Sequence, residues 1–186
     1  AYFAFAGYKM NDFTPSIYKT DDYGQSWEKI VDGLPGDTFA RTVRVDPKRP
    51  GLLYAGTETG AFVSFDDGDN WQSLQLNLPE VPITDLYIQQ DDLVVSTQGR
   101  SLWILDDLTP LHQLFDGLPD DEVVLLKPRN PVRNISNGYP DSGPGKNPPV
   151  GLQVHYVLED AIDEPIQFDI VNGEGEVVYT DRSDLE

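Results

Sequence analysis

Apolar residues in the first two thirds of the chain occur in short runs, and each run is bounded by Gly, Pro or Asp. The runs are clearest in residues 42–76, at Thr42–Val45, Leu52–Thr57, Ala61–Phe65 and Trp71–Leu76. Short apolar runs between turn residues are typical of β-strands. The pattern therefore predicts four short antiparallel strands in this segment.

The same segment belongs to an internal repeat. Four residues recur 44 positions later in the chain: Thr20, Asp22, Gly24 and Trp27 return as Ser64, Asp66, Gly68 and Trp71. Both copies read hydroxyl, any, Asp, any, Gly, any, small polar residue, Trp. A period of this size indicates propeller blades or solenoid repeats, and four strands per unit is the blade count of a propeller.

The repeated residues suit a structural turn better than a catalytic site. A hydroxyl and a carboxylate two positions apart can hydrogen-bond to the backbone of their own turn. Gly24 and Gly68 supply the positive φ that a tight reversal demands, and we expect Trp27 and Trp71 to bury their rings under the turn. The motif therefore predicts a hairpin clip, with no catalytic role for Asp22 or Asp66.

Degraded units flank the clearest one. Leu93–Thr97 aligns with Leu53–Thr57, and Leu105–Asp107 aligns with Phe65–Asp67, but Leu108 replaces the glycine. The first unit supplies strands at Tyr2–Ala6, Ser16–Thr20 and Trp27–Val31 and no opening strand, so we expect it to be truncated. Residues 1–116 are thus predicted to be all-β, an incomplete β-propeller of about three four-stranded antiparallel blades.

The pattern changes after residue 116. Residues 117–149 are rich in Pro and Gly and predict a linker, with one strand at Val123–Leu126 lying against the repeat. Residues 150–186 predict strands at Leu152–Leu158, Ile166–Val171 and Val177–Thr180, with Ile166, Phe168 and Ile170 turned inward. We expect this part to begin an immunoglobulin-like or fibronectin-like module, a partial β-sandwich.

Composition excludes several partners. The formal charge of -19 repels phosphate backbones and anionic lipid heads, so nucleic acid and membrane surfaces are not expected as partners. No apolar run approaches the roughly 20 residues needed to span a bilayer, so membrane insertion is not expected either. The chain has no cysteine, and His112 and His155 are too far apart for a zinc site. Asp66, Asp67, Asp69 and Asn70 lack the spacing of a calcium loop. We therefore expect no metal and no cofactor.

The two turn motifs resemble the Asp-box, or BNR, repeats of sialidases, xyloglucanase-type glycoside hydrolases, sortilin-like receptors and photosystem II assembly factors. Val43–Pro47 running into Leu53–Thr57 and the second motif resembles a xyloglucanase-like blade. Asp92–Asp107 resembles the last blade of large bacterial BNR-repeat or sortilin-like glycosyl hydrolases. The resemblance covers about residues 1–116 and implies a secreted or periplasmic protein. The rest of the propeller, or a further copy of the chain, would then cover the blade faces.

A shared repeat implies a fold and not a reaction, so two hypotheses for the function stay open. The first is a scaffold or binding surface for a polypeptide or a glycan. The alternative is the C-terminal portion of a glycoside hydrolase whose catalytic residues lie mostly outside this chain. The carboxylates to test first are Asp106 and Asp107, near Arg100, and sugar rings could stack on exposed aromatic residues. These are Tyr8, Tyr18, Tyr23, Trp27 and Trp103.

Overall fold

The computed structural model describes residues 1–130, 151–160 and 165–182. The described residues fall into two compact units, and each is considered by itself. The first unit consists of Ala1–Leu118 and Leu126–His155, and the second consists of Pro119–Leu125 and Tyr156–Glu186. Within these described ranges the chain is all-β with little helix, as the pattern predicted.

The segment with the clearest pattern forms a four-stranded antiparallel sheet, the second sheet. Its strands are β4 (Ala40–Val45), β5 (Leu53–Thr57), β6 (Ala61–Ser64) and β7 (Gln72–Ser73), in sequence order. All four predicted strands are confirmed, with bounds that differ by one to three residues. β5 and β6 are buried along their whole length, which explains why apolar residues cover both of their faces.

Three-stranded antiparallel sheets stand on either side of the second sheet. The first sheet contains β1 (Tyr2–Ala4), β2 (Ile17–Lys19) and β3 (Glu28–Lys29), and a 3-10 turn, η1 (Gly7–Met10), lies between β1 and β2. The third sheet contains β8 (Ile83–Gln89), β9 (Asp92–Thr97) and β10 (Leu102–Leu105). The first sheet has the three strands expected of a truncated unit, whereas the third sheet has three strands among the described residues where a four-stranded blade was expected.

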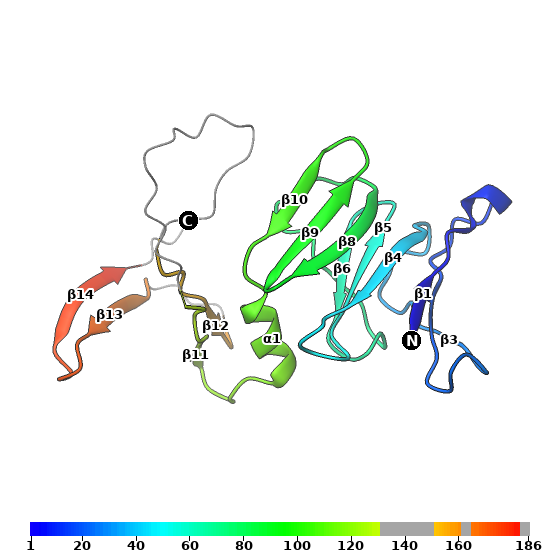
Figure 1. Cartoon of the computed structure of the whole chain (residues 1–186). Helices are drawn as coiled ribbons and strands as arrows, with labels where there is room; N and C mark the ends of the chain where they lie inside the picture. Colours follow the sequence, from blue (N-terminus) through cyan, green and yellow to red (C-terminus); the bar gives the residue numbers. More distant parts are fainter. Residues whose placement is uncertain (131–150, 161–164, 183–186) are drawn as a thin grey trace. The chain divides into compact units, whose positions relative to one another are not determined.

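The three sheets of the first unit follow one another in chain order, from blue to green in Figure 1. Two apolar layers join them. One layer lies between the first and second sheets and contains Ile17, Ile30, Leu53, Phe62 and Trp71, among others. The other lies between the second and third sheets and is centred on Tyr54, Val63, Ile83, Leu86, Leu93 and Val95. The second sheet is thus covered on both faces.

A short helix replaces the turn that a third copy of the motif would have made. α1 (Thr109–Asp116) starts just after β10 and has Pro110 in its first turn, where the missing N–H costs nothing. Asp107 accepts hydrogen bonds from the backbone N–H (3.0 Å) and hydroxyl (2.7 Å) of Thr109, which holds the start of the helix. The substitution of Leu108 for glycine is therefore accompanied by a change of local structure.

A buried hydrogen-bond network ties α1 to the second sheet. The Asp46 carboxylate, 1% exposed, accepts from the Tyr54 hydroxyl at 3.1 Å and lies 2.8 Å from His112 Nε2 on α1. Its other oxygen accepts from the backbone N–H groups of Lys48 and Arg49. A buried carboxylate needs such partners because an unpaired one is costly. His112 is thus buried, and its contact with Asp46 holds α1 against the second sheet.

The second unit contains two two-stranded antiparallel sheets in its described residues. β11 (Val123–Leu125) pairs with β12 (Tyr156–Leu158), so a strand forms where one was predicted, and its expected place against the repeat stays a prediction. β13 (Gln167–Val171) pairs with β14 (Val177–Arg182) across a turn in which the Asn172 side chain accepts from the N–H groups of Glu174 and Glu176.

The inward face expected for β13 is not buried in this structure. Phe168 is half-buried and contacts the Tyr156 ring at 5.2 Å between centroids, but Ile170 is 56% exposed. The described strands of this unit form two two-stranded sheets, and the partial β-sandwich stays a prediction. Most of the predicted linker, residues 131–149, lies outside the described residues.

Candidate functional site

The two repeated turns carry the same set of hydrogen bonds. In the first turn the Thr20 hydroxyl donates to Asp22 Oδ1 (2.8 Å) and accepts from the N–H of Gly24 (2.9 Å). In the second turn the Ser64 hydroxyl makes the same bonds with Asp66 (2.8 Å) and Gly68 (2.9 Å). Short polar side chains thus satisfy the backbone of both turns from within.

Each carboxylate also binds the small polar residue four positions later. Asp22 accepts from the N–H (2.9 Å) and the hydroxyl (2.6 Å) of Ser26. Asp66 accepts from the N–H and the side-chain amide of Asn70, both at 2.8 Å. Both oxygens of each carboxylate therefore have a partner inside the turn.

These bonds favour the ionised carboxylates. The hydroxyl and N–H of Ser26, followed by the Thr20 hydroxyl, lower the pKa of Asp22 to about 2. Burial acts to raise the pKa of Asp66, but the hydrogen bonds from Asn70 and Ser64 outweigh it and leave the pKa below its usual value. A carboxylate with a low pKa and saturated oxygens is a poor proton donor or base at neutral pH.

The two tryptophans differ, which corrects one expectation. Trp71 is 3% exposed, and its indole N–H donates to the backbone carbonyl of Ile30 at 3.1 Å. Trp27 is 44% exposed and packs edge-on against Phe3, with ring centroids 4.7 Å apart. Burial of the ring under the turn therefore holds for the second turn and not for the first.

A polar groove lies where β1, β4 and β8 come together. Its volume is about 420 Å³, and it is lined by Tyr2, Phe3 and Ala4 of β1, by Arg41–Arg44 of β4, and by Thr84 and Asp85 of β8. Volumes of this order are typical of small-molecule sites, although most such sites are more apolar. Its wall includes the charged side chains of Arg41, Arg44 and Asp85.

An ion pair across the groove fixes Arg44. Its guanidinium contacts Asp85 Oδ1, and its Nε donates to the backbone carbonyl of Leu86 at 2.9 Å. Thr42 donates to the same Asp85 oxygen at 3.2 Å. The side chains of Arg44 and Asp85 remain 42% and 58% exposed, so solvent reaches the pair. A ligand in the groove could therefore meet a donor and an acceptor held side by side.

Arg41 occupies the neighbouring position of the wall. It pairs with Glu58 and lies over the Phe39 ring, 5.0 Å from its centroid. Planar guanidinium groups held by carboxylates and rings lose little freedom when they bind. The sequence alone assigned no role to these arginines. The signal that could have found Arg44 is its place as a charged residue in the apolar run Thr42–Val45.

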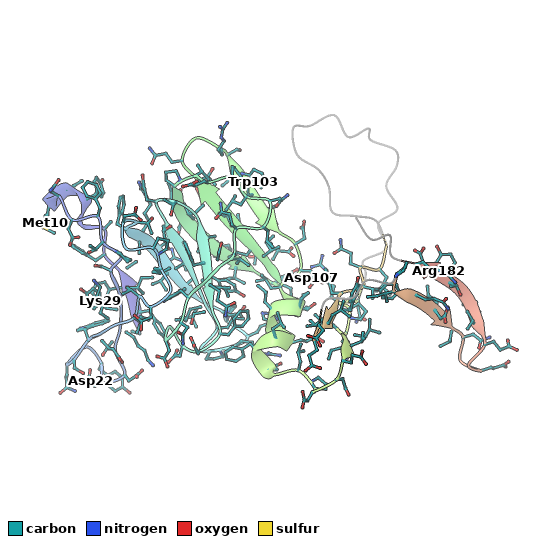
Figure 2. The ribbon with its side chains drawn as sticks, turned by 180° about the vertical axis from the view of Figure 1, so that it is seen from behind. Met10, Asp22, Lys29, Trp103, Asp107 and Arg182 are labelled. Carbon is teal, nitrogen blue, oxygen red and sulfur yellow. The ribbon has the colours of Figure 1, made fainter. Side chains whose placement is uncertain are left out.

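The carboxylate pair chosen from the sequence does not form a site with Arg100. Figure 2 shows Trp103 and Asp107 toward opposite ends of the third sheet. Arg100 lies in the turn before β10, and Asp106 and Asp107 follow the end of that strand. Asp107 holds Thr109, as described above. Burial, together with the nearby charge of Asp92, raises the pKa of Asp106, which favours its protonated form.

The expected sugar-stacking residues are scattered. Tyr23 is fully exposed at the first turn, and Tyr8 stacks on Phe39 with ring centroids 5.1 Å apart. Tyr18 stacks on Phe3 at 5.0 Å. Trp103 packs against the layer between the second and third sheets and donates to the Arg100 carbonyl at 2.9 Å. The groove is lined by two aromatic residues, Tyr2 and Phe3, and neither was among the expected sugar-stacking residues.

Neither a metal cluster nor a membrane helix is found in the part of the chain that the structure describes. No group of three or more His, Asp or Glu side chains there could hold a metal ion. No helix within those residues has the length and apolar character needed to cross a bilayer.

The described residues thus define an all-β protein with small antiparallel sheets, two of which contain the same hydrogen-bonded turn between neighbouring strands. The chain is similar to xyloglucanase Xgh74A of Acetivibrio thermocellus, with 26% identity over 132 residues. A second sequence of that enzyme from the same species matches equally well. The match covers 62% of this chain and 15% of the xyloglucanase. No family model and no solved structure matches the chain.

Proposed function

We propose that this chain is part of an Asp-box β-propeller protein related to glycoside hydrolases, and that it acts there as a scaffold and glycan-binding surface. Three observations support the architecture: the two turns with equal hydrogen bonds, the four-stranded second sheet, and the stacking of sheets through apolar layers. A propeller is built from such sheets stacked face to face.

The polar groove carries the proposal for binding. Arg44, Asp85, Thr42 and Thr84 place donors and acceptors together, which suits a ligand that is rich in hydroxyl groups. Because each arginine of the groove is paired with a carboxylate, the groove has little charge to offer an anion. The overall charge of -19 also repels anionic ligands. A neutral glycan fits these conditions, and xyloglucan is the glycan named for the similar enzyme.

The experiment is a titration of the ¹⁵N-labelled chain with xyloglucan oligosaccharides, followed by amide chemical shifts. We expect saturable shifts at Thr42, Arg44 and Asp85 and none at the second unit. Arg44→Met removes the guanidinium and keeps part of its packing, so it should abolish the shifts. Arg49→Met is the matched control, because Arg49 pairs with Asp116 and does not line the groove.

Flat shifts at millimolar oligosaccharide would contradict glycan binding at the groove. Shifts that survive Arg44→Met and disappear in Arg49→Met would place binding elsewhere. Binding of an acidic oligosaccharide in preference to a neutral one would contradict the charge argument.

The alternative is that the chain is the C-terminal portion of a glycoside hydrolase whose catalytic residues lie mostly outside it. The similarity to a xyloglucanase and the raised pKa of Asp106 favour this alternative. Glycosidic cleavage needs a second carboxylate at a defined distance, and Asp92 already accepts from Arg129 and from the N–H of Asp107. We expect this chain alone to release no reducing sugar from xyloglucan. Release that Asp106→Asn abolishes would favour the enzyme.

A further inference from the structure

The sheets of the first unit stack by one rule. We call face A the face of a sheet that carries Ala55 and its cross-strand partner Phe62 in the second sheet, and face B the opposite face, with Tyr54 and Val63. Face A of the second sheet contacts the first sheet, and face B contacts the third. The two faces of the second sheet are therefore both covered, each by a different neighbour.

The registers identify the same faces in the outer sheets. In the first sheet Phe3 lies opposite Tyr18, two residues before Thr20, just as Phe62 lies two residues before Ser64. Phe3 and Tyr18 therefore mark face A, and Ile17 on face B packs against the second sheet. In the third sheet Val95 and its partner Trp103 mark face A and pack against the second sheet. At both junctions face A of one sheet meets face B of the preceding one.

Among the described residues of the first unit, this rule leaves one face of each kind without a neighbouring sheet. Face A of the first sheet exposes Phe3 (40%) and Trp27 (44%), and Trp27 is the repeat equivalent of the buried Trp71. Face B of the third sheet exposes Tyr87 (62%), Leu102 (66%) and Ile104 (57%), and Tyr87 and Ile104 both pair with Val94. Contiguous apolar surface of this kind marks interaction sites in soluble proteins.

We infer that these two faces bind each other between copies of the chain, so that face B of one copy covers face A of the next. The inference rests on the repeat architecture proposed above and not on glycan binding. The contact would continue the junction that the chain forms twice within itself. It is heterologous, because the two surfaces differ, and each copy keeps one face free for a further copy.

The charges at the two faces favour their contact, whereas the net charge of the chain opposes the approach of two copies. Lys29 lies in the same row as Phe3 and Tyr18 on face A, whereas Asp92 lies at the edge of face B, next to the row of Ile104. These charges are of opposite sign. The net charge of -19 still repels whole molecules at long range, so association should strengthen with added salt, which screens that repulsion.

The test is the mass of the chain in solution, measured by light scattering across two decades of micromolar concentration. Trp27→Glu spoils face A and Ile104→Glu spoils face B. We expect the mass of the unaltered chain to rise with concentration, and each variant alone to remain a monomer. An equimolar mixture of the two variants should reach the dimer and stop there, because one intact A and one intact B remain to pair.

Val178→Glu is the control, since it places the same charge on an exposed apolar residue of the second unit; it should associate like the unaltered chain. If near-ultraviolet circular dichroism shows that either variant is unfolded, Tyr18→Gln and Leu102→Glu replace them on the same faces. A monomer at every concentration, a mixture that stays monomeric, or a single variant that still associates would overturn the inference. None of the four altered residues on these faces lines the groove. The sugar titration therefore succeeds or fails independently of this test of association.

Discussion

The first and second turns share their hydrogen bonds but not their surroundings. Both place a non-glycine residue at positive φ, Tyr23 at 61° and Asp67 at 62°, and both follow it with a glycine at positive φ. The second turn is covered by the first sheet, which buries Trp71 and packs Ile30 against Gly68. The first turn has no such cover. The comparison separates what a local motif contributes from what its burial adds.

The largest difference should come from the two tryptophans. Trp71→Ala removes a buried ring and its bond to Ile30 and should cost about 3–5 kcal/mol of unfolding free energy. Trp27→Ala removes a half-exposed ring and should cost roughly 1 kcal/mol, in line with its smaller buried area. Urea denaturation of both variants measures the difference. Equal losses would show that burial under a neighbouring sheet is not what stabilises the motif.

The next largest difference should be in the stability lost when Gly24 or Gly68 is replaced by alanine. A Cβ at Gly68 would lie 2.3 Å from Ile30 Cδ1 and 3.2 Å from Ile30 Cβ, whereas a Cβ at Gly24 would have ordinary contact, 3.6 Å from the Trp27 ring. Both substitutions to alanine strain a positive φ, which costs about 1–2 kcal/mol. Overpacking at Gly68→Ala should add about 1 kcal/mol or more. Thermal unfolding of Gly24→Ala and Gly68→Ala ranks them, and Gly24→Ala should be the milder.

A smaller difference is expected at the residue before each glycine. Asp67 contacts the Lys19 amine and the Tyr2 hydroxyl on the first sheet, whereas Tyr23 is fully exposed. Burial, followed by the bond to Asp67, raises the pKa of Tyr2 to about 12. Asp67→Asn keeps a residue that tolerates positive φ, so its cost of about 1 kcal/mol should reflect the lost ion pair. Tyr23→Asn should be neutral, and phenol titration should show the pKa of Tyr2 falling only in Asp67→Asn.

The two turns should differ least in how the free energy of unfolding depends on acid pH. The folded pKa of Asp22 lies at about 2, below its ordinary 3.8. A depressed pKa stabilises the folded state above the unfolded value, and that stabilisation is lost as pH falls through the folded value. Stability should therefore decline between these two values, and Asp22→Asn and Asp66→Asn should each flatten the decline. Urea midpoints measured from pH 5 downward test this, with Asp169→Asn, in the other unit, as a control for a lowered pKa outside the turns.

The strands of the repeat could be read from the sequence because their cause is local. Gly, Pro and Asp end each apolar run, and the hydroxyl and carboxylate of each turn bond within eight residues of chain. The second sheet was predicted best, because both of its faces are buried and its apolar runs are therefore continuous. β8 was missed, since its exposed positions Thr84, Asp85 and Tyr87 interrupt the apolar pattern.

In the third copy of the repeat, an alignment error of one residue assigns Trp103 to the wrong face of the sheet. Aligning Asp106 with Asp66 puts Trp103 in the place of Val63, on face B. The structure pairs Trp103 with Val95, as Phe62 pairs with Ala55, so the ring lies on face A and packs against the second sheet. The turn after β9 is longer than the turn after β5, and a shift of one residue turns a side chain to the other face. Sequence spacing could not reveal this.

The groove depends on tertiary structure for a similar reason. Arg44 and Asp85 are far apart in the chain and meet only because β4 and β8 belong to stacked sheets. The same holds for Asp46 and His112, which the sequence left as unrelated polar residues. Asp106 and Asp107 are close to Arg100 in the sequence, but closeness in the sequence does not show which charged residues meet in the folded chain.

Local interactions along the chain are sufficient to specify the turns, the strands between them and the all-β class, because each depends on side chains that act within a few residues of their own backbone. Tertiary structure decided which tryptophan is buried, which charged residues share the groove, and which apolar faces remain open. Those properties depend on which surface of one sheet covers another, and packing between sheets joins residues that no local pattern connects.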